Sequence, residues 1–408
     1  MSNDMKPEIR FPGFTEDWEQ RKVGEFYDFK NGLNKEKEFF GSGVPIVNFV
    51  DVFHNRGLTP EMLKGRVTLS EKEIKNFEVK QGDIFFTRTS ETINEIGYPS
   101  VMLGAPTDTV FSGFVLRGRA RSVDPMNNLF KRYVFFTESF RNEMVKKSSM
   151  TTRALTSGTA IKEMYVQYPT SKDEQHKIGA FLAQIDETIT LKQRKLDLLK
   201  ETKKGFLQKM FPKNGAKVPE IRFPGFTKDW EERKLGDVFS ERSERSSEGE
   251  LISVTINSGV IKASELDRKD NSSDNKSNYK KVEVGDIAYN SMRMWQGASG
   301  YSSYEGILSP AYTVIIPKEG TDSKFFAYDF KRYDMIQTFK RNSQGLTSDT
   351  WNLKFPTLKL VKIMVPSIEE QKQIAAFFER LDNTIALHER ELDVLKETKK
   401  GFLQKMFV

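Results

Sequence analysis

Two segments of the chain carry apolar residues at an alternating spacing of four and three positions, which is typical of a long helix with a helical partner. The segments lie within residues 171–212 and 367–408. This heptad spacing places apolar side chains along one helix face, which a second helix must cover. The apolar positions are Ile178, Leu182, Ile185, Ile189, Leu196 and Leu199 in the first segment, and Ile374, Phe378, Leu381, Ile385, Leu392 and Leu395 in the second.

Start signals support both helices. Residues 171–174 and 367–370 each fit the S-x-x-E capping box, in which serine and glutamate satisfy free amide groups of the first turn. A helix of about 40 residues is about 60 Å long at a rise of about 1.5 Å per residue. Gly205 and Gly401 interrupt the pattern at matching places and cost about 1 kcal/mol each. We therefore expect the last part of each helix to bend or to serve docking.

The natural partner of each apolar stripe is the other stripe. Equivalent stripes can meet about a two-fold axis, as the surfaces of homodimers do. If that axis crosses the helices, they form an intramolecular antiparallel coiled coil, and the globular domains lie at its opposite ends. The alternative is that each helix packs only on its own domain. We favour the coiled coil because so long a rod has too little surrounding chain to be a core helix.

An internal repeat extends beyond the helices. Residues 7–25 and 219–237 are identical at 15 of 19 positions, and residues 196–211 and 392–407 at 15 of 16. Between these blocks the two halves keep the same order of motifs but share little sequence. Two copies of one scaffold that present different surfaces suit two different ligand elements. Neutral drift is the alternative, although drift should also have eroded the ends.

The repeat divides the chain into a first domain (1–170), a first helix (171–212), a second domain (213–366) and a second helix (367–408). Both domains combine short β-type runs with one amphipathic helix, so we predict two α+β domains. The candidate strands are 44–50, 84–87, 110–116, 251–256 and 311–316, and the candidate domain helices are 129–147 and 323–341.

Composition narrows the class of protein. The 408 residues, 37% of them hydrophobic, suffice for two domains with separate cores. A net charge of +7 suits a polyanionic partner, although a well-solvated surface explains it equally. The absence of cysteine excludes disulfide scaffolds, thiolate zinc sites and thiol nucleophiles. No apolar run approaches the roughly 20 residues of a membrane span, so we expect a cytoplasmic protein without a membrane partner.

Matched polar stretches are the candidate binding elements. One follows each Gly-Asp-Ile motif (82–84 and 285–287), and another lies beside each Leu-Thr-Ser motif (155–157 and 346–348). Arginine reads guanine and asparagine or glutamine reads adenine in the major groove of DNA. The candidate DNA-contacting residues are Thr87, Arg88, Thr89, Ser90, Lys147, Ser149, Thr151, Thr152 and Arg153 in the first half, and Asn290, Ser291, Arg293, Met294, Trp295, Gln296, Arg341, Asn342, Ser343 and Gln344 in the second.

Simpler interpretations remain open for these stretches. Each polar stretch taken alone also fits a plain solvated loop. Trp295 fits a core position, which we favour, or a contact with a sugar or a thymine methyl group.

No catalytic centre is predicted. The chain lacks the Pro-Pro pair of a DNA methyltransferase base site, and the F-x-G-x-G of residues 39–43 has no strand before it and no helix after it, so we interpret it as a hairpin turn. There is no G-x-x-x-x-G-K-[ST] loop for a nucleotide phosphate. His54, His176 and His388 lie in unrelated contexts, which argues against a metal site.

In this order, the motifs resemble those of the specificity subunits of type I restriction–modification systems. The resemblance rests on the segments 18–24 and 230–236, which begin with Trp-Glu, and on the two Gly-Asp-Ile motifs. It also rests on the two helix openings. These consist of Pro169, Glu174, Gln175, Ile178 and Gly179 in the first copy, and Pro366, Glu370, Gln371, Ile374 and Ala375 in the second.

The resemblance covers nearly the whole chain and implies a function. It implies two target recognition domains on an antiparallel helical spacer, each reading one half-site of a bipartite target in double-stranded DNA. It implies a non-catalytic subunit that assembles with two modification (methyltransferase) subunits and two restriction and translocation subunits. S-adenosylmethionine, ATP and Mg²⁺ are then expected on those partners and not on this chain. The rival interpretations are a stand-alone DNA-binding or scaffold protein and an enzyme with an unrecognised site.

Overall fold

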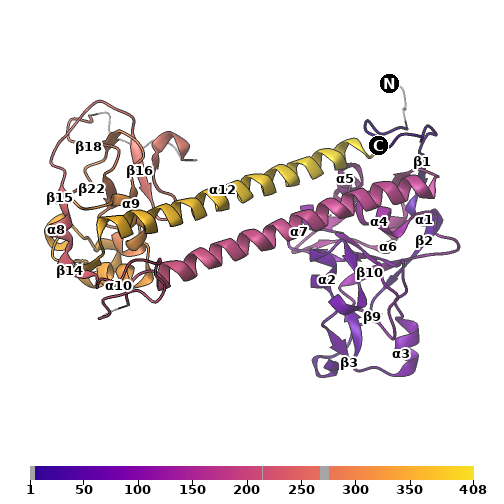
Figure 1. Cartoon of the computed structure of the whole chain (residues 1–408). Helices are drawn as coiled ribbons and strands as arrows, with labels where there is room; N and C mark the ends of the chain where they lie inside the picture. Colours follow the sequence, from indigo (N-terminus) through magenta and orange to yellow (C-terminus); the bar gives the residue numbers. More distant parts are fainter. Residues whose placement is uncertain (1–4, 214, 267–274) are drawn as a thin grey trace. The chain divides into compact units, whose positions relative to one another are not determined.

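The computed structural model describes residues 5–213, 215–266 and 275–408 (Figure 1). The chain forms two compact units. The first unit comprises residues 1–193 and 391–408, and the second comprises residues 194–390. Each unit therefore contains one of the two divergent domains together with part of both long helices.

The two long helices are confirmed. Helix α7 spans Lys172–Lys209 and helix α12 spans Ile368–Lys405, 38 residues each. Each is capped by the serine before it, because the Ser171 hydroxyl accepts the Glu174 amide at 3.3 Å and Ser367 does the same for Glu370 at 3.4 Å. Both helices continue through their glycines, where an added Cβ would meet nothing within 4 Å. The glycines are therefore no interruption of either helix.

The helices pack antiparallel within each unit. In the first unit, Lys192 pairs with Glu391 at 2.6 Å, and Lys399 pairs with Asp186. Residue numbers thus rise along one helix as they fall along the other. The same order holds in the second unit, where the pairs are Lys200–Glu389 and Lys203–Asp382.

The predicted stripe lies along the helix pair. Of its residues, Ile178, Leu182, Leu196, Ile374, Phe378 and Leu392 are buried, and the other six are half-buried. Apolar residues elsewhere on the helices, such as Leu198 and Leu387, are exposed. Each helix also packs on the domain that precedes it, so both packing modes that the sequence allowed are present. Gly179 permits this contact in the first unit, since a Cβ there would lie 2.5 Å from the Leu129 backbone.

The first unit is built on a five-stranded sheet of order β2-β10-β6-β8-β4, with a smaller sheet of order β5-β3-β9 and the pair β1-β13 beside it. Strand β10 is antiparallel to both β2 and β6. The strands are β1 (Glu19–Lys22), β2 (Tyr27–Asn31), β3 (Phe40–Val47), β4 (Gly57–Leu58), β5 (Arg66–Val67), β6 (Ile84–Thr87), β7 (Thr89–Ser90), β8 (Pro99–Met102), β9 (Val110–Phe111), β10 (Val115–Ala120), β11 (Ser149–Met150), β12 (Ala154–Leu155) and β13 (Tyr165–Tyr168). The helices are α1 (Val23–Phe26), α2 (Phe49–His54), α3 (Glu71–Asn76), α4 (Asn128–Val134), α5 (Glu138–Lys147) and α6 (Gly158–Lys162).

The second unit repeats this plan in shorter form. Its four-stranded sheet has the order β15-β22-β19-β20, which matches β2-β10-β6-β8. The strands are β14 (Glu231–Lys234), β15 (Phe239–Glu241), β16 (Ile252–Thr255), β17 (Gly259–Lys262), β18 (Lys280–Val282), β19 (Ile287–Asn290), β20 (Ser299–Tyr301), β21 (Gly306–Leu308), β22 (Tyr312–Pro317) and β23 (Lys362–Val365). The helices are α8 (Leu235–Val238), α9 (Ser323–Asp329), α10 (Tyr333–Asn342) and α11 (Phe355–Leu358).

The prediction of one amphipathic helix per domain was wrong, because each region forms two helices. In the first unit the Thr137 hydroxyl accepts the Phe140 amide at 3.4 Å and starts α5. A threonine at a helix start competes with continuation of the preceding helix. In the second unit, Arg332 closes the turn between α9 and α10 by donating to the buried Asp329 at 2.6 Å.

Three β-type predictions also need correction. The run 44–50 leaves the strand at Val47 because Asn48 caps helix α2. The run 110–116 is two strands separated by a turn at Ser112, whose carbonyl accepts the Val115 amide at 3.0 Å. Residues 39–43 are an irregularity within the pairing of β3 with β5, not a hairpin turn, and Gly41 and Gly43 there have positive φ.

The core of each unit includes the end of a long helix from the other repeat. In the first unit, Phe407 after α12 packs on Phe130 and Trp18, with ring centroids 5.5 and 6.0 Å apart. In the second, Phe211 after α7 contacts Phe325 at 5.2 Å and Trp230 at 6.1 Å. The near-identical segments therefore make equivalent contacts in both units.

Candidate nucleic-acid interfaces

In the first unit, the structure brings the two predicted polar stretches together. The buried strand β6 leads through Arg88 into β7, and β7 pairs with β12 in a three-stranded sheet of order β11-β12-β7. Ser90 lies opposite Ala154, and Thr89 lies opposite Leu155. Stretches more than 50 residues apart in the sequence thus form one continuous surface.

Most candidates on this surface are accessible. Lys147, Ser149, Thr151, Thr152 and Arg153 are exposed, and Arg88 and Thr89 are half-buried. Thr87 and Ser90 are buried, which corrects their assignment as contact residues. Their hydroxyls instead accept backbone amides, that of Tyr98 at 2.9 Å and that of Thr92 at 3.3 Å. These two residues hold the strand that carries the surface.

The second unit joins its polar stretches differently. Strand β19 leads into the 3-10 helix Met294–Gln296, and the Leu353 amide donates to the Ser291 carbonyl at 2.8 Å. Gln344 forms a bridge with Asn352. The rings of Trp295 and Trp351 meet edge to face at 5.2 Å. Residues 290–296 and 340–352 therefore share one surface.

Exposure again separates the candidates. Arg293, Arg341 and Gln344 are exposed, and Asn290, Gln296, Asn342 and Ser343 are half-buried. Ser291 and Met294 are buried, so they too are corrected to supporting positions.

Trp295 is half-buried rather than a core residue, so the core interpretation was wrong. Its indole N–H donates to the Met292 carbonyl at 3.0 Å. Sequence reasoning missed its neighbour Trp351 and the exposed Leu346 of the same segment. Leu346 is fully exposed, at 102% of its reference area, and Leu155 of the matching motif is 41% exposed. The signal was the leucine that begins each Leu-Thr-Ser motif.

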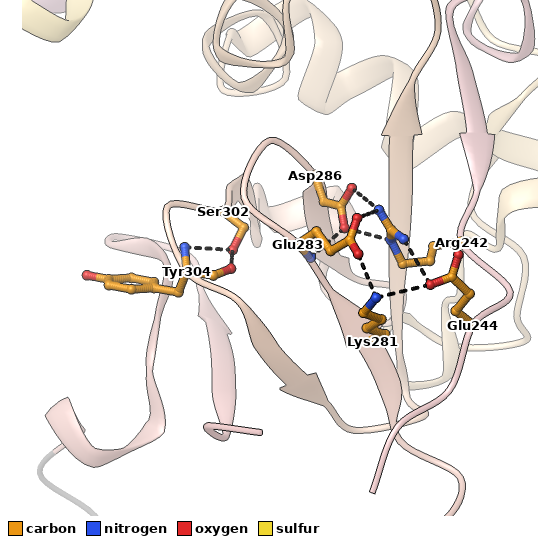
Figure 2. Close-up of polar contacts among 7 residues, drawn as sticks. All are labelled: Arg242, Glu244, Lys281, Glu283, Asp286, Ser302 and Tyr304. Carbon is orange, nitrogen blue, oxygen red and sulfur yellow. Dashed lines mark hydrogen bonds and ion pairs between the residues drawn. The ribbon is translucent and has the colours of Figure 1, made fainter. Parts of the chain in front are cut away.

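The aspartate of each Gly-Asp-Ile motif anchors the strand that leads to the polar surface. In the second unit, Arg242 binds both oxygens of the buried Asp286, at 2.8 and 2.9 Å (Figure 2). Arg242 also reaches Glu283 at 2.9 Å and Glu244 at 3.3 Å, and Lys281 bridges these two glutamates (Figure 2). The hydrogen bonds that Arg242 donates to Asp286 raise the pKa of its guanidinium.

The first unit has the same anchor but takes its arginine from another strand. Asp83 is buried and accepts two hydrogen bonds from Arg119, at 2.7 and 2.6 Å. Arg119 lies on β10, beside β6, whereas Arg242 directly follows β15. The preceding Gly82 and Gly285 have φ of +88° and +103°, a conformation that glycine adopts without strain. Both turns therefore hold a buried aspartate that an arginine neutralises.

A second ion pair in each unit joins an arginine near the start of the domain to the first turn of a long helix. Arg10 binds both oxygens of the buried Glu174 at 2.6 and 2.8 Å, and Arg222 binds both oxygens of Glu370 at 2.7 Å. These hydrogen bonds raise the pKa of each arginine. The glutamates predicted to complete the capping boxes thus serve in these ion pairs.

The part of the chain that the structure describes contains no group of three or more His, Cys, Asp or Glu residues that could hold a metal ion. Within the same residues, no helix is long and apolar enough to span a membrane.

Comparison with known proteins identifies the family. The sequence profile of the type I restriction modification DNA specificity domain matches residues 15–201 and again residues 227–397. The chain belongs to this family. A Methanocaldococcus jannaschii protein, provisionally described as the type I restriction enzyme MjaX specificity subunit, is 22% identical over 406 residues, which cover 95% of this chain and 92% of the relative.

Solved structures support the fold of a specificity subunit. The S subunit of a type I restriction–modification system from M. genitalium aligns over 99% of both chains with a TM-score of 0.60 and 16% identity. A chain from a study of complex assembly and conformational transition of the type I system covers 98% of this chain and 99% of its own, with a TM-score of 0.53 and 16% identity. At this identity the likeness concerns the fold alone.

Proposed function

We propose that this specificity subunit reads a bipartite target in double-stranded DNA, with one half-site for each unit. The observation that carries the proposal is the shared surface in each unit, formed by polar stretches from distant parts of the sequence at the end of equivalent strands β6 and β19. The two surfaces carry different side chains on the same strand order. Different half-sites follow from that difference.

Arg88 and Arg293 are the proposed base readers. Each follows the buried strand after Gly-Asp-Ile, and neither guanidinium forms an ion pair with another described residue. A free guanidinium can bind guanine O6 and N7 through two hydrogen bonds. Lysines and arginines nearby, such as Lys147 and Arg341, would contact phosphates, which position the protein without reading sequence.

The long helices are proposed to set the spacing of the half-sites. Both run unbroken for 38 residues, and both contribute to both units. Half-sites read from the same face of a duplex have centres about 34 Å apart, or one helical turn.

The partners are further parts of the proposal. They are two modification subunits that carry S-adenosylmethionine and two restriction subunits that use ATP and Mg²⁺, while this chain binds no cofactor and catalyses no step. The long helices and the two domains together would scaffold that assembly.

Methylation profiling of the complex with its modification subunits tests this function. Arg88→Ala and Arg293→Ala should each relax a different half-site, with a loss of about 1–3 kcal/mol in discrimination. Arg233→Ala is the matched control, because Arg233 is exposed and already paired with Glu231 at 2.6 Å. Methylation at unchanged sequences in both variants would contradict the assignment. DNA binding without any methyltransferase partner would favour a stand-alone DNA-binding protein.

A further inference from the structure

Among the arginines of the first unit that lie over aromatic rings outside the candidate reading stretches, three gather around the rings of Tyr133 and Phe136. Arg56 precedes β4, Arg132 lies in α4 and Arg141 lies in α5. The guanidinium carbon of Arg56 is 4.0 Å from the Phe136 ring centroid, and that of Arg141 is 5.8 Å from the same ring. Arg56 and Arg132 both approach the Tyr133 ring, at 6.0 and 5.4 Å. We refer to these three residues as the arginine cluster.

No member of the arginine cluster forms an ion pair with a described carboxylate. Arg141 donates to the carbonyls of Gly97 and Asn94, both at 2.9 Å. Nη1 of Arg56 and Nε of Arg132 are buried and have no hydrogen-bond partner. All three side chains are partly open to solvent. The cluster therefore has both exposed surface and unused donors.

The carboxylate that attracts Arg56 electrostatically is already occupied. Asp186 on α7 accepts the Tyr133 hydroxyl at 2.8 Å and pairs with Lys399 of α12. Arg56, Arg132 and Lys399 thus surround the Tyr133–Asp186 pair, which leaves a local surplus of two positive charges. Burial lowers the pKa of Arg56 and lowers that of Arg141 to about 10, because desolvation disfavours the charged form.

The second unit shares the scaffold of this region but lacks two of the three arginines, and its partly buried cation there is Lys331, which donates to the Gly297 carbonyl at 2.6 Å. The Tyr–Asp–Lys group recurs as Tyr328, Asp382 and Lys203, with the hydroxyl 2.9 Å from the carboxylate. At the positions of Arg132 and Arg141, however, the second unit has Ala327 and Ile336. Arg132 and Arg141 are therefore not required to build this part of the fold.

We propose that Arg56, Arg132 and Arg141 form a phosphate-binding site for the DNA backbone beside the reading surface of the first unit. Guanidinium groups bind phosphate through paired hydrogen bonds, are weakly hydrated and stack well on aromatic rings. The site adjoins the reading surface because Arg141 holds the loop at residues 94–97 that follows β7. The proposal rests on the proposed function, since DNA is the polyanion that already reaches this unit.

Salt-dependent DNA binding tests the site. The double variant Arg56→Gln/Arg132→Gln is compared with the native chain, each with its modification subunits, by fluorescence anisotropy on a target duplex and an unrelated duplex over a range of KCl. The slope of log affinity against log salt should fall by about 0.9 for each lost phosphate contact. Affinity should fall by roughly tenfold on both duplexes, while the methylated sequence stays unchanged.

Thermal unfolding distinguishes a role of the arginine cluster in DNA binding from a role in stabilising the fold. Because the two charges have no counter-ion in the free chain, their removal should leave the unfolding temperature unchanged or higher. Arg121→Gln is the matched control in the same unit, since Arg121 is exposed and paired with Asp28 at 2.9 Å; it should leave the salt slope unchanged. An unchanged slope in the double variant, or a lower unfolding temperature with the native slope, overturns the proposal.

Two further outcomes would also contradict the proposed phosphate-binding site. Loss of the modification subunits from the purified complex, with the native salt slope, would assign the arginine cluster to an acidic protein surface. Relaxed methylation at one half-site would assign it to base reading. Failure of the native complex to bind any duplex would instead refute the proposed function.

Discussion

The buried ion pair between Arg242 and Asp286 should govern the second reading surface. Arg242→Met would remove two hydrogen bonds of 2.8 and 2.9 Å and leave the buried carboxylate with the Glu283 amide at 2.8 Å. Breaking a buried pair from one side typically costs about 3–5 kcal/mol, since the remaining charge is uncompensated. We therefore expect a local loss of that size around residues 283–296.

Substitution of the aspartate in the same ion pair should lower stability less than substitution of the arginine. In Asp286→Asn, Arg242 keeps Glu283 at 2.9 Å and Glu244 at 3.3 Å, so its charge remains compensated. The expected loss is about 1–3 kcal/mol, the range for an imperfectly satisfied buried group. Replacement of both residues by apolar ones should recover part of the Arg242→Met loss.

Hydrogen exchange measured on peptides is the suitable assay, because a chain with two compact units need not unfold in a single step. Hydrogen-exchange protection of residues 283–296 should fall most in Arg242→Met and less in Asp286→Asn. Protection of peptides from the first unit should stay unchanged in both variants. Methylation profiling should show loss of one half-site only. The reasoning is refuted if Arg242→Met loses less than about 1 kcal/mol of protection, or if Asp286→Asn is the more damaging change.

Further predictions concern packing, pH and the exposed leucine. Gly179→Ala should lower stability by about 1–3 kcal/mol, because its Cβ would lie 2.5 Å from the Leu129 backbone, whereas Gly205→Ala should raise it by about 1 kcal/mol in open space; thermal unfolding of both variants decides. Burial lowers the pKa of Lys331 to about 8 from an ordinary 10.5, so the unfolded chain binds this proton more tightly. Stability of the second unit should then rise between these pH values, and denaturant titrations of Lys331→Met should lose that rise. Leu346→Ala should change stability by less than about 0.5 kcal/mol yet weaken binding to DNA with a thymine in the half-site of the second unit; equal effects on thymine and uracil duplexes would exclude a methyl contact.

The long helices could be predicted because their signal is long. A heptad stripe repeated over 38 residues, with a serine cap, outweighs any local exception such as Gly205. The prediction of one helix per domain failed for the opposite reason, because its signal is short. A single Thr137 hydroxyl bond is enough to end one short helix and begin another, and the apolar spacing on both sides of it gives no warning.

The positions of the candidate interfaces could be predicted from the sequence, but not which of their side chains are exposed. Matched positions after Gly-Asp-Ile indicated where the polar surface lies. They did not reveal that Thr87 and Met294 are buried, since a strand or turn hides alternate side chains. The arginine partners of the two aspartates could not be predicted either, because Arg119 lies on β10 whereas Arg242 follows β15, which is not the equivalent strand. Only tertiary packing shows such equivalence.

In each unit, different residues stabilise the fold and form the proposed DNA-contacting surface. This separation explains how one fold can present two different surfaces. In the ion pairs Arg10–Glu174 and Arg222–Glu370, the arginine comes from a repeated block and the glutamate from the start of a long helix, so neither pair uses a residue of the reading stretches. Exposed reading residues contribute little to folding, so they can differ freely between copies. Arg56 and Arg132 depart from this separation, because each has a buried guanidinium nitrogen without a hydrogen-bond partner, which disfavours folding of the free chain. Arg132 is replaced by Ala327 in the equivalent fold, so its unpaired charge is explained by a ligand that supplies negative charge, as the proposed phosphate site requires.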